Sequence, residues 1–299
     1  MKRLTICLLL FPCLAVSLSA QDKPRKEKKD MKGPWSHVVL SASSPDGLTW
    51  TIDDGVRLDR ASVPCAVVTP DGKIMLYFVD ASKKGPETTN CAVSTDGINF
   101  KKLGLSIKGM KVRKALDPSI LLREDGTFDL YYFGHSPGGK DSKPGDFNKE
   151  RHRIHRATSG DGVNFVEKGI CFAKTGLVDP DVFSWKKKDF MFVFSLQEKK
   201  TAIATSRTGS RFNFDGYLHL EGWGTTQPLV VGDKLRMYAF EQRAREGNRV
   251  CSFLSTDGIR WTKEEGVRLQ AGKGKQFTDP FVVKWKSGYK MYFKTGREE

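Results

Sequence analysis

Carboxylate side chains stand next to prolines at regular intervals in this sequence. Asp117, Asp179 and Asp279 each precede a proline that opens an apolar run, and Val63 and Gln227 hold the same place in two further runs. If the five places meet, three carboxylates and an amide share one site. Hydrolysis of a glycosidic bond needs such a set, because one carboxyl protonates the leaving oxygen while another acts as base or nucleophile. Crowded like charges raise at least one pKa, which suits the acid.

Each Asp-Pro also has a structural interpretation, in which the aspartate bonds local backbone at a strand entry. The elements around it distinguish these uses. A motif of the form S-x-D-G-x-x-[WF] recurs in step with these prolines, and a spacing of about 50 residues between copies is typical of repeat architectures. Its copies begin at Ser44, Ser94, Ser159, Ser206 and Ser255, the fourth being worn, with Thr208 in place of the aspartate.

The residues between a proline run and the next motif predict β-structure. Each proline run is followed by a Gly/Asp turn and a second aromatic or branched run, as in IMLYFVD and FDLYYFG, which together predict a hairpin. A third strand then leads into the Asp-Gly turn and a fourth strand follows. Four antiparallel strands in about 50 residues are the size of a β-propeller blade.

The two ends of the repeat array predict how the ring closes. The last unit stops after its second strand, at YKMYFKTG, and the first residues beyond a charged segment, PWSHVVLSASSPDGLTW, are an unpaired third and fourth strand. Joining these halves removes open sheet edges. The sequence therefore predicts an all-β, five-bladed β-propeller with four antiparallel strands per blade. Its inner strands line a central channel, where the residues before the prolines converge.

These features resemble the arabinanase/levansucrase/invertase-type propeller glycosidases, over residues 35–297. The resemblance implies a glycoside hydrolase. In its arabinanase and xylosidase branch an Asp opens the first blade, another Asp the third and a Glu the fourth. Here those places hold Val63, Asp179 and Thr226. In the invertase branch Asp117 and Asp179 fit the first two places if the blades are renumbered. Some related propellers hold a central calcium ion, but nothing here demands one, and no cofactor is expected.

The missing acid must then come from elsewhere. Glu198 and Glu241 end second strands that approach the same mouth, and they are the candidates, each with a solvated loop glutamate as the plainer interpretation. Glu221 is a further possibility under the invertase numbering. Trp223 is a rim aromatic on which a sugar could stack.

Basic residues gather beside the one long insertion, SPGGKDSKPGDFNKERHR, which follows His135. Long loops on a scaffold often carry binding residues. A strand through RHRIHR would point Arg151, Arg153 and His155 to one face, where they could grip a carboxylate or sulfate. Arg113 precedes Asp117 and could lower its pKa. The expected substrate-binding residues are His135, Gln227, Trp223, Arg113, Arg153 and His155.

The N-terminus predicts export. Residues 1–20 have the basic start, short apolar core and small final residues of a bacterial signal peptide. Residues 21–34 are highly charged and predict a flexible tether, followed by the propeller at 35–299. We expect a secreted or periplasmic protein. The four cysteines beyond the leader, at 65, 91, 171 and 251, are expected to be buried free thiols rather than disulfides or a zinc site.

Charge limits the range of partners. The chain carries a net charge of +15, which favours polyanions such as sulfated or uronate-bearing glycans. Nucleic acid is not expected for an exported protein, nor is membrane insertion. The first hypothesis is thus an exported glycosidase with Asp117, Asp179 and Asp279 as catalytic groups. A non-catalytic glycan- or surface-binding propeller is the alternative, and lyase chemistry on a uronate polymer through His135 is a third. The sugar, the linkage and the oligomeric state are left open.

Overall fold

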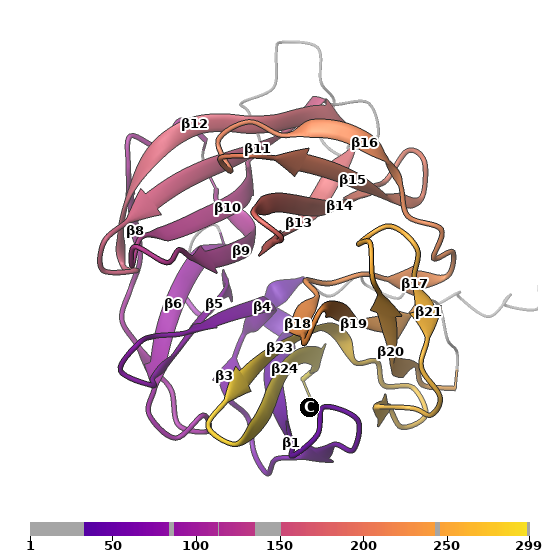
Figure 1. The fold of residues 1–299 in the computed structure, drawn as a ribbon. Coiled ribbons are helices and arrows are strands. Elements are labelled where there is room, and N and C mark those ends of the chain that lie inside the picture. Colours follow the sequence, from indigo (N-terminus) through magenta and orange to yellow (C-terminus); the bar gives the residue numbers. More distant parts are fainter. Residues whose placement is uncertain (1–32, 84–86, 113, 135–150, 243–245, 298–299) are drawn as a thin grey trace, which may run out of the picture. The chain divides into compact units, whose positions relative to one another are not determined.

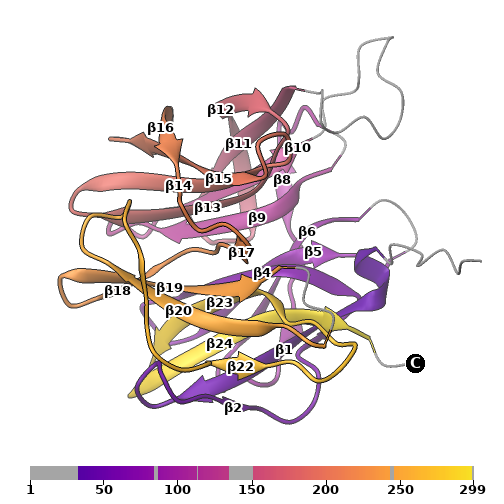
Figure 2. The same ribbon diagram turned by 90° about the vertical axis from the view of Figure 1, so that its right-hand side faces the viewer.

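The predicted five-bladed propeller is confirmed. The computed structural model describes residues 33–83, 87–112, 114–134, 151–242 and 246–297. In these residues the strands form five sheets, which Figures 1 and 2 show arranged around a common centre. None of the described helices is long and apolar enough to cross a membrane.

The first three blades follow the chain. Blade 1 comprises β4 (Ala61–Val68), β5 (Ile74–Asp80), β6 (Thr88–Ser94) and β7 (Lys101–Lys102). Blade 2 comprises β9 (Leu116–Leu122), β10 (Phe128–Gly134), β11 (Arg151–Ser159) and β12 (Asn164–Thr175), with β8 (Ser106–Lys108) added parallel to β12. Blade 3 comprises β13 (Leu177–Trp185), β14 (Lys188–Ser195), β15 (Lys200–Ser206) and β16 (Asn213–Tyr217).

The last two blades are less regular. Blade 4 comprises β17 (Trp223–Gly224), β18 (Leu229–Val231), β19 (Lys234–Glu241), β20 (Arg249–Ser255), β21 (Thr262–Lys263) and β22 (Leu269–Gln270). Its inner strand is therefore two short pieces. Blade 5 joins β23 (Thr278–Trp285) and β24 (Gly288–Gly296) to β1 (His37–Ser44), β2 (Thr51–Ile52) and β3 (Leu58–Asp59), after a short 3-10 turn, η1 (Pro34–Ser36). The pairing of β1 with β24, from His37↔Gly296 to Ser44↔Tyr289, is the closure that the sequence predicts.

The repeated motif builds a rigid turn. In the first copy Ser44 Oγ accepts from the Gly47 N–H at 2.8 Å, and Asp46 Oδ1 accepts from the Leu48 and Thr49 N–H groups at 2.8 Å each. These hydrogen bonds hold the pKa of Asp46 well below its usual range. The turn needs positive φ at the glycine, +74° at Gly47, which glycine adopts without a steric penalty.

The motif also latches neighbouring blades together. Tyr292 Oη, on the second strand of blade 5, donates to Gly97 O in the motif of blade 1 at 3.1 Å. The closing aromatic of that motif, Phe100, packs edge-on against the same tyrosine ring, with 5.5 Å between centroids. The same hydrogen bond joins Tyr77 to Gly162, Tyr131 to Gly209 and Tyr238 to Gly47.

One boundary between blades lacks this hydrogen bond. Phe192 occupies the tyrosine position in blade 3, and only its ring contact with Trp261 remains, with 6.0 Å between centroids. The other large buried side chains fill the spaces between adjacent sheets. Cys65, Cys91, Cys171 and Cys251 are free and buried, as expected.

Candidate active site in the central channel

Four inner strands are distorted at the residue that precedes the proline. The backbone there has positive φ, between +49° and +52°, at Val63, Asp117, Asp179 and Asp279. Each strand also loses ladder register at this point. A bulge of this kind re-aims a side chain, and positive φ is uncommon outside glycine and an outlier for a β-branched residue such as Val63. The repeated distortion therefore re-aims one side chain per blade, and in blades 2, 3 and 5 that side chain is a carboxyl.

The three carboxyl groups interact with one another. Asp179 donates hydrogen bonds to Asp117 from both its backbone and its side chain. Burial raises the pKa of Asp117 to about 6, and the nearby charge of Lys294 limits that rise. Burial, followed by the charges of Asp117 and Asp279, raises the pKa of Asp179 well above its usual value. Both pKa values are thus raised by burial, and that of Asp179 is raised further by the neighbouring carboxylates.

A lysine neutralises the third carboxyl. Lys294 Nζ lies 2.7 Å from Asp279 Oδ2, and both side chains are about one-fifth exposed, at 21% and 20%. Burial alone would lower the pKa of Lys294, but the charges of Asp279, Asp179 and Asp117 raise it instead. His37 lies close by, with its Nδ1 3.2 Å from Ser62 Oγ. Burial and the charge of Lys294 lower the pKa of His37 to about 4, so it is neutral.

The sequence interpretation missed three members of this cluster. Asp181 lies two residues beyond Asp179 on β13, and burial and the charge of Asp279 raise its pKa well above the usual value. The sequence Asp-Pro-Asp at residues 179–181 was the signal that could have identified it. Lys294 could also have been found. When the second strands of the five blades are aligned, the other four have an apolar residue at the position that this lysine occupies in blade 5. Nothing in the sequence around His37 points to the channel.

Blade 4 contributes an amide and no acid. The Gln227 N–H donates to the Asp181 carboxyl group. Gln227 Oε1 is buried and has no hydrogen-bond partner in the described part of the chain. Thr226, at the place of the family's acid, is buried and donates from Oγ1 to Tyr238 O at 2.6 Å. Thr226 therefore has a structural role, and the glutamate of the family pattern has no substitute at its own position.

The proposed acids lie at or just after the ends of second strands, and the rim aromatic lies on β17, opposite one of them. Glu198 is exposed in the β14–β15 turn, where its N–H donates to Ser195 Oγ. Glu241 accepts from Arg249 Nη2 at 2.8 Å and from Arg249 Nε at 3.1 Å, and this pairing lowers its pKa. Trp223 is half-buried between the edge of Phe253 and the ammonium group of Lys263. The lowered pKa of Glu241 does not suit a proton donor.

The basic strand of blade 2 does not present one basic face. Arg153 is exposed, whereas His155 is buried at 4% exposure, stacked on Tyr132 and 2.7 Å from Glu167 Oε1 through Nδ1. The expected alternation is wrong here because the ladder of β11 and β12 shifts register between Ile154 and His155. His135 and Arg113 lie outside the described residues, and so does the side chain of Arg151.

The described residues contain no group of three or more His, Cys, Asp or Glu side chains arranged to hold a metal ion. The site that they do form is a half-buried cluster of Asp117, Asp179, Asp181 and Asp279. Lys294 is its one cation among the described residues.

Solved structures share this fold. The chain is similar to a family 117 glycoside hydrolase from Zobellia galactanivorans, with 15% identity, a TM-score of 0.54, and coverage of 79% of this chain and 84% of that one. For an α-L-arabinofuranosidase from Clostridium thermocellum the identity is 14% and the TM-score 0.55, and the match covers 78% of this chain and 81% of that one. For a β-fructofuranosidase of family 32 from Bombyx mori the identity is 15% and the TM-score 0.59, and the match covers 87% of this chain and 57% of that one. No protein-family model and no curated protein matches the chain. The chain thus has the five-bladed propeller fold of these glycosidases.

Proposed function

We propose that this protein is an exported glycoside hydrolase that cleaves a saccharide in the central channel. The observation that carries the proposal is the repeated bulge at Asp117, Asp179 and Asp279, whose carboxyls form one cluster in which the pKa values of Asp117 and Asp179 are raised. A cluster with one ionised and one protonated carboxyl is what acid–base hydrolysis requires. The proposal needs no cofactor. It also takes residues 1–20 as a signal peptide, which N-terminal sequencing of the secreted protein would test.

The pKa values suggest the roles. Ionised Asp117 would take a proton from water as the water oxygen attacks the anomeric carbon. A protonated carboxyl would give its proton to the departing glycosidic oxygen, so that the proton balance closes. Asp179 is in direct contact with Asp117, too close for the two to flank a glycosidic bond, since such pairs stand about 5 Å or more apart. Asp179 would therefore orient Asp117, and Asp181 would be the donor.

The test is a screen of the purified protein against aryl glycosides and natural polysaccharides, followed by release of reducing ends. Asp117→Asn and Asp181→Asn should each lower the rate by about 10²–10⁴-fold, the usual contribution of a general base or acid. Asp233→Asn, at an exposed turn, is the matched control and should keep full activity. If Asp117→Asn and Asp181→Asn both still release reducing ends at the full rate, the chemistry does not take place at these carboxyls.

A non-catalytic glycan-binding propeller is the second candidate. It is favoured by Val63, which puts an apolar side chain at one of the bulges, and by the structural role of Thr226. A binder would release no reducing ends from any substrate. It would still retain a saccharide in affinity electrophoresis, and Asp117→Asn would leave that retention within about twofold.

A further inference from the structure

One cleft formed by the described residues lies away from the carboxylate cluster. Its volume is about 680 Å³, and it opens between blades 2 and 3. Its walls begin where the inner strands end, at Arg123 after β9 and at Trp185 of β13, whereas Asp117 and Asp179 lie at the starts of those strands. The cleft and the channel site are therefore at opposite ends of the same strands.

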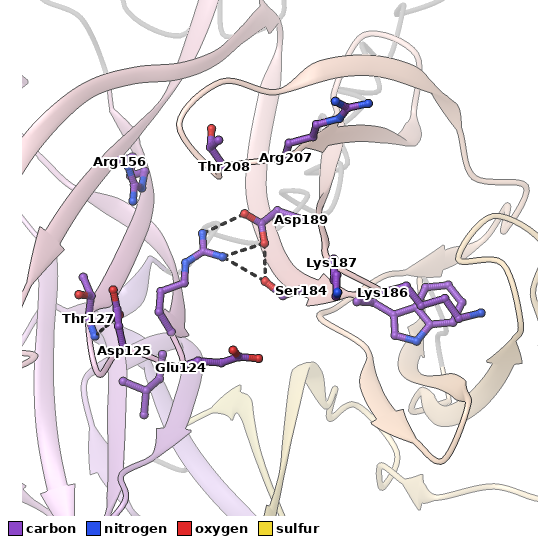
Figure 3. Close-up of a pocket in the computed structure, with 13 residues that line it drawn as sticks. Glu124, Asp125, Thr127, Arg156, Ser184, Lys186, Lys187, Asp189, Arg207 and Thr208 are labelled. Atoms are coloured by element: carbon purple, nitrogen blue, oxygen red, sulfur yellow. Dashed lines mark hydrogen bonds and ion pairs between the residues drawn. The ribbon is translucent and has the colours of Figure 1, made fainter.

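The floor of the cleft is a satisfied ion-pair network. Arg123 donates from Nε to Asp129 at 2.6 Å and from Nη1 and Nη2 to Asp189 at 2.8 and 2.9 Å. Arg156 Nη2 donates to Asp129 at 2.7 Å, and Ser184 Oγ donates to Asp189. Figure 3 marks the interactions that Asp189 and Ser184 make on this floor. Two guanidinium groups balance two carboxylates here, so the floor holds the blades together without attracting a charged ligand.

The wall from blade 3 carries cations that this network does not use. Lys186 and Lys187 form the β13–β14 turn and Arg207 the β15–β16 turn, and all three are exposed. The described residues provide no carboxylate partner for them, although the Lys186 ammonium lies 4.0 Å from the Trp185 ring centroid. Thr208 is the worn motif position, where the four other copies have an aspartate. The motif that lost its negative charge is thus the one beside this cleft.

The wall from blade 2 has the opposite charge. Glu124 and Asp125 are exposed on the β9–β10 turn, and Figure 3 shows them across the cleft from Arg207 and Lys187. Asp125 Oδ1 accepts from the Thr127 N–H at 2.9 Å, and no described residue pairs with Glu124. Carboxylates accept hydrogen bonds from sugar hydroxyls, so this wall suits the hydroxyl groups of a saccharide.

We propose that this cleft binds an anionic saccharide, with its acidic group on Lys187 and Arg207 and its hydroxyl groups on Glu124. The carboxylates in the channel would repel an acidic sugar, so the cleft gives such a polymer a separate point of attachment. The choice of a saccharide rests on the proposed function. Binding is measured without catalysis, so the two proposals can fail separately.

The experiment is calorimetric titration of the full chain with a short oligogalacturonate and with its methyl ester, which has the same rings and no charge. The ester should bind at least about tenfold more weakly. Lys187→Asn/Arg207→Gln should weaken binding of the acid form by about tenfold, the sum expected for two exposed charge contacts. Asparagine suits Lys187, because the backbone there has φ of +59°.

The control removes the same charge elsewhere. Lys101→Gln/Lys108→Gln changes two exposed lysines on outer strands of blades 1 and 2, and it should leave the affinity unchanged, as should Asp179→Asn in the channel. The proposal would be overturned if acid and ester bind equally well, or if the control double variant loses as much affinity as Lys187→Asn/Arg207→Gln. It would also be overturned if Asp179→Asn loses affinity, or if neither oligogalacturonate nor a sulfated oligosaccharide binds. Tighter binding of single-stranded DNA through Lys187 and Arg207 would also overturn it.

Discussion

Replacing Tyr292 by phenylalanine tests whether the motif holds the ring together. Tyr292 is fully buried, and its hydroxyl donates to Gly97 O across the boundary between blades 5 and 1. Phenylalanine keeps the ring and therefore the edge-on contact with Phe100. The change removes one donor and leaves one buried carbonyl without its partner.

The expected effect follows from that single hydrogen bond. Leaving a buried acceptor unsatisfied costs about 1–3 kcal/mol. In a domain of this size each 1 kcal/mol lowers the melting temperature by about 2–4 °C. Tyr292→Phe should therefore lower the free energy of unfolding by about 1–3 kcal/mol and the melting temperature by about 2–12 °C.

Urea denaturation and a thermal melt measure both quantities. Tyr289→Phe is the matched control, on the same strand, because its half-buried hydroxyl has no hydrogen-bond partner among the described residues. It should change the free energy of unfolding by less than about 0.5 kcal/mol. If Tyr292→Phe is no more destabilising than Tyr289→Phe, the latch contributes nothing and the repeat needs another explanation.

Further predictions concern the missing latch and the channel. Phe192→Tyr should add a hydrogen bond to the motif of blade 4 and raise the free energy of unfolding by up to about 1 kcal/mol; a loss in urea denaturation would mean that the hydroxyl does not fit. Asp117 has a pKa of about 6, so hydrolysis should accelerate as pH rises through that value, and a flat profile would contradict its role as base. Because folding raises this pKa above the unfolded value of about 3.9, the group's stabilisation is present below about pH 4 and lost above about pH 6. Asp117→Asn should therefore stabilise the fold at neutral pH by about 1–3 kcal/mol in the same assay, and a destabilised variant would refute this. Lys294→Met should move the midpoint of the rate profile to higher pH and reduce stability by about 3 kcal/mol; an unmoved midpoint would show that the ammonium does not act on Asp117. Val63→Asn should relieve an unfavourable backbone conformation and stabilise by about 1 kcal/mol, which equilibrium unfolding can check.

The architecture was readable because the repeat encodes it. Five copies of one turn motif and five proline runs predict the number of blades, and the unmatched strands at the two ends predict the pairing of β1 with β24. Each of these inferences depends on local patterns such as alternation and Asp-Gly turns. The same patterns do not report which blade a side chain contacts. The latch between Tyr292 and Gly97 joins residues from opposite ends of the chain, and it was not foreseen.

The channel site was only partly predictable. The Asp-Pro positions identified three carboxyls, but the positive φ that turns them inward is not a property that the sequence states. The charge on Asp279 is balanced by Lys294, which lies on a neighbouring strand. A register shift in blade 2 buries His155, and strict alternation could not anticipate it. These features depend on tertiary contacts and on bulges rather than on local preference.

The pairing of β1 with β24 has a consequence for how the chain folds. Lys290 Nζ donates to Ser43 Oγ across 247 residues. The first strand of the domain can therefore pair only after the last strand has been synthesised. Contacts so distant in sequence make folding slow. Until blade 5 forms, β1 and β24 expose unpaired edges on which other chains could add strands. Aggregation during synthesis should therefore depend on β1 more than on any strand inside blades 1 to 4, whose partners emerge soon after one another.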